Sequence, residues 1–215
     1  MPTAMTYTGL LTDLRRYLER GNLSDPTVYD QLPTLVNLAE RRLARELKIQ
    51  GTVTVVASTF VQGEPRVAKP NRWRETVSMR VGTGASNDTL SEIYPRAYEY
   101  IRMFWPDQTN EDVPRFYADY DFDNWIVAPT PDDAYPYEVL YYELPPLLDE
   151  TTQTNWYTEK APDALLYASL LEATPFLKDD ARIKTWEGFL NRAISVLNGE
   201  DIRMISDRSI VRRED

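Results

Sequence analysis

The stretch ATPFLKDDARIKTWEGFL, residues 173–190, joins two helical patterns at an acidic corner. Pro175 lacks a backbone N–H, so we expect it to kink or end the helix that precedes it. Asp179 is expected to cap the next helix, because its carboxylate can accept a hydrogen bond from an otherwise unpaired backbone N–H. Asp180 then lies in the first turn, where a negative charge complements the helix macrodipole. We therefore interpret the two aspartates as a helix corner and not as a catalytic or metal site.

Apolar residues at helical spacing predict helices near both ends of the chain. The predicted helices run from about Thr8 to Arg20, from Pro33 to a stop at Gly51, over residues 164–178 and from Asp180 to about Ile205. Asp25 followed by Pro26 has the pattern of an N-cap and a first helical residue, which predicts a short turn before Pro33. A near-heptad apolar stripe in the last helix is expected to face the core and consists of Ile183, Trp186, Leu190, Ala193, Leu197 and Met204.

The period changes to β-like alternation after Gly51, and β-branched residues become frequent. Strands are predicted at Thr52–Val61, Arg66–Pro70, Trp73–Gly82, Thr89–Pro95 and Tyr137–Pro146, with two more inside 114–131 around a turn at Asp121–Asn124. A short helix is predicted from Arg96 to Trp105, since Pro106 disfavours its continuation.

This order of elements predicts an α+β fold with segregated helices and strands. We expect residues 1–51 and 152–205 to form one discontinuous helical bundle. Residues 52–151 are expected to form a strand-rich antiparallel insert, and residues 206–215 a C-terminal tail. No apolar run approaches the roughly 20 residues that a membrane helix needs.

The composition excludes several kinds of chemistry. The 215 residues include no Cys and no His, which rules out disulfides, thiolate zinc sites, Cys nucleophiles and Ser-His-Asp triads. The formal net charge of −10 disfavours binding to nucleic acid phosphates. Among the basic residues 19 are Arg and only 5 are Lys, and Arg together with the 14 Tyr is typical of protein interfaces.

Two motifs resemble ligand sites but depart from them. Asp119, Asp121 and Asp123 have the spacing of a calcium loop, yet Asn124 and Thr130 stand where that loop needs Gly and Glu. We interpret this segment as a turn. The sequence GTGASN, residues 82–87, begins like a phosphate loop but lacks its third Gly and the Lys that should follow, which favours a hairpin loop.

Two long stretches carry a resemblance to a known family. They are LPTLVNLAERRLARELKIQG, residues 32–51, and PDALLYASLLEATPFLKDDARIKTWEGFLNRAISVLNGEDIR, residues 162–203. Together with YEVLYYELPPLLDETTQTNWY, residues 137–157, they resemble the head-to-tail adaptor (connector) proteins of tailed, chiefly short-tailed, bacteriophages. The C-terminal stretch, residues 162–203, carries most of the specificity of this resemblance.

The resemblance implies a dodecameric ring beneath the portal vertex, which extends the DNA channel and offers a platform for a tail nozzle or tube protein. Double-stranded DNA is expected to pass without specific binding, in line with the acidic composition. The C-terminal region is implied to bind the portal protein, and the implied residues are Asp201, Ile202, Arg203, Met204, Ile205, Arg208, Ile210, Val211, Arg212 and Arg213. The implied location is the neck of the virion after assembly in the host cytoplasm, with no catalytic residue, cofactor, metal or membrane contact.

Two other classes of function stay open at this point. One is a virion-associated hydrolase that uses two carboxylates, for which Asp119/Asp121 and Asp179/Asp180 are the densest clusters. The other is a monomeric binding module or assembly chaperone. Imaging with the portal protein would separate these classes, because only the adaptor is expected to form rings.

Overall fold

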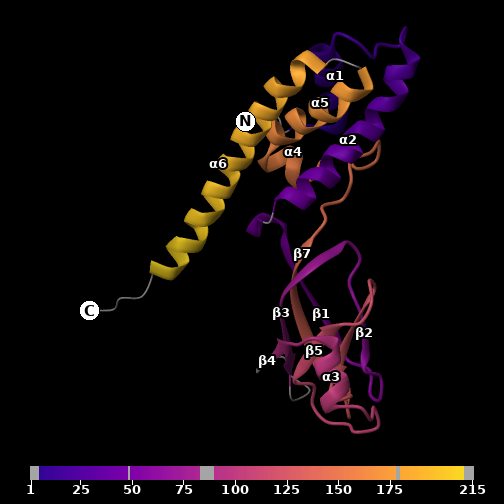
Figure 1. Ribbon diagram of the computed structural model, residues 1–215, viewed down its shortest axis with the longest axis vertical. Coiled ribbons are helices and arrows are strands. Elements are labelled where there is room, and N and C mark those ends of the chain that lie inside the picture. Colours follow the sequence, from indigo (N-terminus) through magenta and orange to yellow (C-terminus); the bar gives the residue numbers. More distant parts are fainter. Residues whose placement is uncertain (1–4, 48, 83–89, 178–179, 211–215) are drawn as a thin grey trace. The chain divides into compact units, whose positions relative to one another are not determined.

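The computed structural model describes residues 5–47, 49–82, 90–177 and 180–210, and of residues 50, 180 and 204–210 it describes the backbone alone (Figure 1). The chain forms two compact units. One consists of Met1–Thr52 and Pro145–Asp215 and the other of Val53–Leu144. We refer to them as the helical unit and the β unit. The described residues form six α-helices and a seven-stranded sheet, so the predicted α+β class is confirmed.

The helical unit is organised around a helix that is buried on all sides. Its α-helices are α1 (Tyr7–Leu18), α2 (Pro26–Glu46), α4 (Trp156–Lys160), α5 (Pro162–Leu177) and α6 (Ile183–Ile210), with 3₁₀ turns at Gln50–Thr52 and Asp180–Arg182. The buried residues of α5 fall at nearly consecutive positions, and they are Ala164, Leu165, Leu166, Ala168, Ser169, Leu170, Leu171, Ala173 and Thr174. A helix that is apolar all round must be covered on every side. Helices α1, α2, α4 and α6 provide that cover (Figure 1).

Helix α2 differs from the prediction at its beginning. Pro33 was expected to start a separate helix, but it lies inside one continuous helix that begins at Pro26. Leu32, Leu35 and Val36 on either side of this proline are buried, and we attribute the continuity to the burial of this stripe, which compensates for one missing backbone hydrogen bond.

The beginning of α2 and the end of α6 also differ from the prediction. The Asp25 carboxylate does not cap α2 and instead forms an ion pair with Arg20 at 3.1 Å. Helix α6 continues to Ile210, five residues beyond its predicted end, so residues 206–210 are helical and do not form a tail. The capping role predicted for Asp179 concerns a residue outside the described part of the chain.

A buried carboxyl group joins α2 to the segment that leads into α4. Glu40 is fully buried, and its carboxylate accepts hydrogen bonds from the backbone N–H of Leu148 at 3.1 Å and from Asn155 Nδ2 at 2.6 Å. Asn155 in turn caps α4 through its side-chain oxygen. Burial raises the pKa of Glu40 to about 7, and the charge of Asp149 acts in the same direction. The two hydrogen bonds and the charge of Arg41 lower the pKa but do not outweigh burial.

The β unit is a curled sheet with its own core. Its strands are β1 (Val53–Thr59), β2 (Arg66–Ala68), β3 (Trp73–Gly82), β4 (Leu90–Pro95), β5 (Phe116–Asp119), β6 (Asn124–Ala128) and β7 (Pro136–Glu143), with helix α3 (Tyr98–Phe104) between β4 and β5. The strand order is β1-β7-β3-β4-β5-β6-β2, and all pairs are antiparallel except β4 with β5. Each predicted strand is therefore present, and the sheet order follows from long-range pairing that the sequence does not reveal.

Alternation along the strands produces two apolar layers in the β unit. Trp125 and Val127 on β6 belong to the inner core, which also contains Tyr137 and Val139 of β7. The intervening residues of β6 point the other way and pack with Ile101 of α3. The sheet therefore buries both faces of β6, which explains why this strand is apolar at nearly every position.

Replacement of Glu40 by Gln tests the buried carboxyl group. Because the pKa rises from 4.5 to about 7 on folding, the unfolded chain loses this proton more easily, and the contribution of Glu40 to stability falls as pH rises through this window. We expect the variant to gain about 3 kcal/mol of unfolding free energy relative to wild type between these two pH values. Urea unfolding across this range measures the difference, and parallel pH profiles of the two proteins would contradict the assignment.

Candidate functional site

Helix α6 is buried along one face only. Trp186, Leu190 and Ala193 pack into the helical core, and Ile183 and Leu197 lie half-buried beside them. This confirms the predicted stripe as far as Leu197. The C-terminal half of α6 extends past the other helices of the helical unit (Figure 1). Helix α6 therefore presents two flanks and a projecting end to other molecules.

One flank of α6 is aromatic and basic. Phe189 stacks on Tyr167 of α5 with ring centroids 5.2 Å apart, yet 42% of Phe189 stays exposed. Val196 lies seven residues further along and is 56% exposed. Arg192 lies between them at the helical spacing that puts all three on one side. We define the aromatic flank as Phe189, Arg192 and Val196 together with Tyr17 of α1, which is 44% exposed and whose ring contacts that of Trp186 with centroids 5.9 Å apart.

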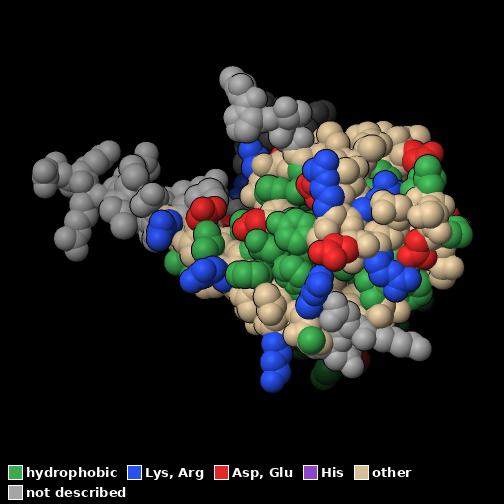
Figure 2. Space-filling model, turned by 90° about the horizontal axis from the view of Figure 1, so that it is seen from above, with side chains coloured by type: hydrophobic (Ala, Val, Ile, Leu, Met, Phe, Trp, Pro, Cys, Tyr) green, Lys and Arg blue, Asp and Glu red, His purple; other side chains and the backbone are tan. Residues whose placement is uncertain are grey.

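Exposed apolar side chains are grouped on the helical unit. Figure 2 looks down on the end of the helical unit that is uppermost in Figure 1, and hydrophobic side chains gather there in a patch among charged ones. Trp, Tyr and Arg are the residues that contribute most often to the energy of protein interfaces. The face of the helical unit in this view therefore exposes an apolar patch bordered by charged side chains.

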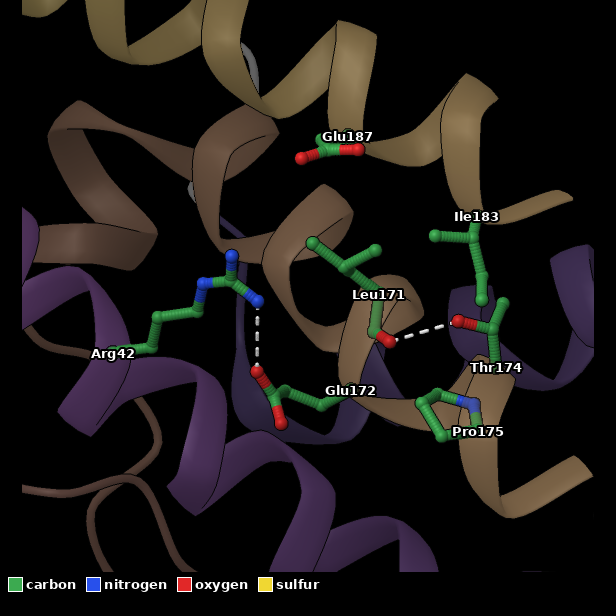
Figure 3. A pocket seen from close by; sticks show the side chains of 7 residues that line it. All are labelled: Arg42, Leu171, Glu172, Thr174, Pro175, Ile183 and Glu187. Atoms are coloured by element: carbon green, nitrogen blue, oxygen red, sulfur yellow. Dashed lines mark hydrogen bonds and ion pairs between the residues drawn. The ribbon is translucent and has the colours of Figure 1, made fainter. Parts of the chain in front are cut away.

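The opposite flank of α6 borders an acidic groove of about 280 Å³ (Figure 3). Glu187 is two residues from Phe189, about 200° around the helix, so the two side chains leave α6 on different sides. We define the acidic groove by its lining residues, which are Arg42, Leu171, Glu172, Thr174, Pro175, Ile183 and Glu187.

The acidic groove is lined by one cationic side chain, Arg42, and by two carboxylates, Glu172 and Glu187. Arg42 of α2 donates a hydrogen bond to Glu172 of α5 at 3.1 Å and another to Glu46 at 2.9 Å. Burial opposes the charge of Arg42, but these hydrogen bonds prevail and raise its pKa above the usual value. Glu187 lies across the groove from this pair (Figure 3). The groove thus holds one guanidinium, which is already paired, and an additional carboxylate that can attract a cation.

Pro175 is accommodated at the floor of this groove without breaking α5. It was predicted to kink or end the helix, but α5 continues to Leu177. Pro175 has no N–H to donate to the carbonyl of Leu171, four residues earlier. The hydroxyl of Thr174 donates to that carbonyl instead, at 2.8 Å (Figure 3). The helix therefore does not end at Pro175, and the carbonyl that the proline leaves unpaired is satisfied.

The predicted portal-binding residues lie at the projecting end of α6. Asp201 is buried, whereas Ile202 is 65% exposed and Arg203 is exposed. The backbone of Met204, Ile205, Arg208 and Ile210 is helical, and the side chains of these four lie outside the described part of the chain, as do Val211, Arg212 and Arg213. Ile202 and Arg203 are therefore the members of this set whose side chains are described and face solvent.

The carboxylates around Asp121 stabilise a turn, as predicted. The side chain of Asp121 accepts hydrogen bonds from the backbone N–H groups of Asp123 and Asn124 at 2.8 and 2.7 Å. The side-chain hydrogen bond with Asn124 and these backbone bonds lower the pKa of Asp121. Asp119 pairs with the buried ammonium of Lys69 at 2.8 Å. Among the described residues no group of three acidic residues is placed to hold a metal ion. The GTGASN segment lies outside the described residues, except Gly82.

Neither the aromatic flank nor the acidic groove was predicted from the sequence. A signal for the aromatic flank was present, because Phe189 and Val196 repeat at a heptad interval outside the core stripe. The groove had no such signal, since Arg42, Glu172 and Glu187 come from three helices that only folding brings together.

The chain shows a match to one known family. A family model described as SU10 adaptor protein matches residues 5–213. No curated protein is similar to the chain at a significant level. Among the described residues, no helix is long and apolar enough to cross a membrane. The family match includes both the helical unit and the β unit, so the two units occur together in the region that the family shares.

Substitution of Thr174 tests the repair of α5 at Pro175. In Thr174→Val the carbonyl of Leu171 loses its hydrogen-bond donor while the side-chain volume is retained. We expect a loss of about 1–3 kcal/mol, the cost of an unsatisfied buried polar group. Thr174→Ser retains the hydroxyl and is the matched control. Thermal or urea unfolding measures both variants, and equal stability of Thr174→Val and wild type would contradict this role of the hydroxyl.

Proposed function

Because the chain belongs to the SU10 adaptor protein family, we propose that it forms a closed ring that joins the portal to the tail and extends the DNA channel. The family agrees with the resemblance seen in the sequence, and the chain is a bacteriophage adaptor protein with a structural role in the virion. The ring, its dodecameric stoichiometry and the two partners are our proposal. So is the arrangement in which the terminal helices form a bundle that carries the strand-rich region as an insert.

The observation that carries the ring is the difference between the two flanks of α6. A closed ring with one copy repeated head to tail needs two different surfaces that complement each other on every subunit. The aromatic flank and the acidic groove lie on opposite sides of the same helix. Such a pair suits a head-to-tail contact, whereas a two-fold dimer would need one surface that is complementary to itself.

The charges of the two surfaces are complementary. The aromatic flank carries Arg192, and the acidic groove carries Glu187 opposite the Arg42–Glu172 pair. When the aromatic flank of one copy packs on the groove of the next, Arg192 approaches Glu187. Phe189 and Val196 then cover the apolar floor around Leu171 and Ile183. Complementary charge fixes the register of such a contact and disfavours other partners.

The remaining parts of the function follow from charge and from the projecting helix. A net charge of −10 suits a conduit through which DNA slides, because an acidic wall repels phosphates. The end of α6 extends beyond the other helices, so it can reach a separate protein without disturbing the helical core (Figure 1). We propose that residues 202–213 bind the portal and that the tail protein binds elsewhere on the ring.

Charge reversal tests the ring contact. Arg192→Glu places two carboxylates against each other at each proposed contact, and Glu187→Arg places two cations there. Like charges at an interface cost several kcal/mol, so each single variant is expected to prevent ring formation. The double variant restores opposite charges and is expected to restore rings. Negative-stain images of each purified protein with the portal protein measure this, and rings in both single variants would contradict the contact.

Truncation tests the portal-binding end. A chain that ends after Arg203 retains the buried Asp201 and the part of the core stripe from Ile183 to Leu197, so its melting temperature should match that of the full chain. We expect it to lose attachment to portal-bearing heads, as measured by co-sedimentation. Arg192→Glu, which alters the ring contact and retains residues 204–215, separates loss of the ring from loss of the docking segment. Undiminished attachment of the truncated chain would exclude portal binding by this segment.

A further inference from the structure

Strand β1 ends the sheet on one side and has an open row of backbone hydrogen-bonding groups. The N–H of Phe60, just after β1, donates to the carbonyl of Tyr135, just before β7, at 2.8 Å, and the register pairs Val56 with Val139. Backbone groups of successive residues in an antiparallel pair point alternately toward and away from the partner strand. Those of Val55, Ala57 and Thr59 therefore point away from β7.

This edge lacks the features that usually prevent strand pairing. Edge strands in soluble proteins are typically short or carry charged residues or proline. The sequence from Thr52 to Val61 is uncharged and contains no proline. Val55 and Val61 are also 52% and 66% exposed. An uncharged edge of seven residues with β-branched side chains is a template for another strand.

The other end of the sheet is protected. Strand β2 has three residues, and its register with β6 leaves the N–H of Arg66 pointing outward. That N–H donates to the carboxylate of Glu64 at 3.1 Å, so the chain itself satisfies it. Among the described strands, β1 is therefore the end strand that remains open along its whole length.

The curl of the sheet places β1 and β2 on either side of a slot of about 340 Å³. Phe60, Val67 and Tyr137 line the slot and belong to the inner core. Arg66 lies at its border and is exposed, and its guanidinium forms an ion pair with Glu64 at 3.9 Å. The slot is therefore apolar, with one guanidinium at its border that belongs to an exposed ion pair.

We propose that β1 is completed by an extended segment of another protein of the particle, which adds a strand along Val55, Ala57 and Thr59. Its alternate side chains are apolar and enter the slot, and it carries a carboxylate that meets Arg66. Recognition of this kind takes its affinity from backbone hydrogen bonds and its specificity from pockets for alternate side chains. The choice of another protein of the particle rests on the proposed function.

The geometry disfavours a second copy of this chain as the occupant. Two β1 edges that pair with each other give a two-fold dimer, and that symmetry does not extend around a head-to-tail ring. Pairing around a ring would require a second, different open edge, and the other end strand, β2, has only three residues and an outward Arg66 N–H that is already bonded to Glu64. A segment of a different protein, in contrast, can pair with the open edge of β1 in every copy of the ring.

Hydrogen exchange of single amides tests the proposal with an internal control. In the free full-length protein, the amides of Val55, Ala57 and Thr59 should exchange rapidly, while those of Val56 and Ser58 are protected by β7. In complete particles we expect the first three to slow at least tenfold and the other two to stay slow. Mass spectrometry with residue-level fragmentation compares the free protein, rings with portal protein alone, and complete particles.

The outcomes separate this inference from the proposed function. Absence of the protein from purified particles would overturn both. Presence in particles with rapid exchange at Val55, Ala57 and Thr59 would overturn the inference alone. Protection that already appears in rings with portal protein and no other partner would support the inference and place the added strand on the portal. Protection in rings of this chain alone would assign the edge to a second copy and overturn the inference.

Substitutions at Ala57 give a second test. Ala57→Pro removes the outward N–H and keeps the ladder to β7, whereas Ala57→Ser keeps the N–H and is the matched control. Val55→Lys places a charge on the edge without removing a backbone group. This variant replaces Ala57→Pro as the test if the proline variant fails to fold. We expect Ala57→Pro and Val55→Lys to retain rings but yield at least tenfold fewer complete particles than Ala57→Ser. Equal yields from folded variants would overturn the proposal.

Discussion

The burial of α5 on every side is the constraint on which the helical unit depends. Its apolar residues occupy nearly consecutive positions, so no single neighbour can cover them. The cover comes from α1 and α2 at one end of the sequence and from α4 and α6 at the other. Two buried hydroxyls of α5 are satisfied within the helix itself. Ser169 donates to the Leu165 carbonyl, and Thr174 donates to the carbonyl that Pro175 leaves unpaired.

The position of α6 follows from this constraint. One face of α6 is used to cover α5, so that face fixes which residues remain on its flanks. Phe189 and Val196 lie on one side, and Ile183 and Glu187 border the groove on the other. The two flanks differ in chemistry because they border different neighbours, α1 and α5 on one side and α2 and α5 on the other. A single buried helix can in this way lead to two unlike surfaces on either side of a neighbouring helix.

The extent to which the sequence predicted the structure depended on the range of the interactions involved. The strands and the core stripe of α6 were predictable, because alternation and helical spacing are local patterns. The continuation of α2 through Pro33 was not, since it depends on the burial of Leu32 and Leu35 against other helices. Glu40 gave no local signal either, because its partners Leu148 and Asn155 lie more than 100 residues away. The acidic groove and the open edge of β1 likewise depend on long-range pairing.

A mass measurement tests the central claim that this chain is a ring-forming adaptor. Mass photometry of the purified full-length protein, mixed with portal protein, compares the particle mass with the subunit mass of 24.9 kDa. The account predicts portal particles whose mass increases by one fixed multiple of the subunit mass, with no smaller multiples at saturation. Portal particles of unchanged mass beside a free 24.9 kDa species would contradict it.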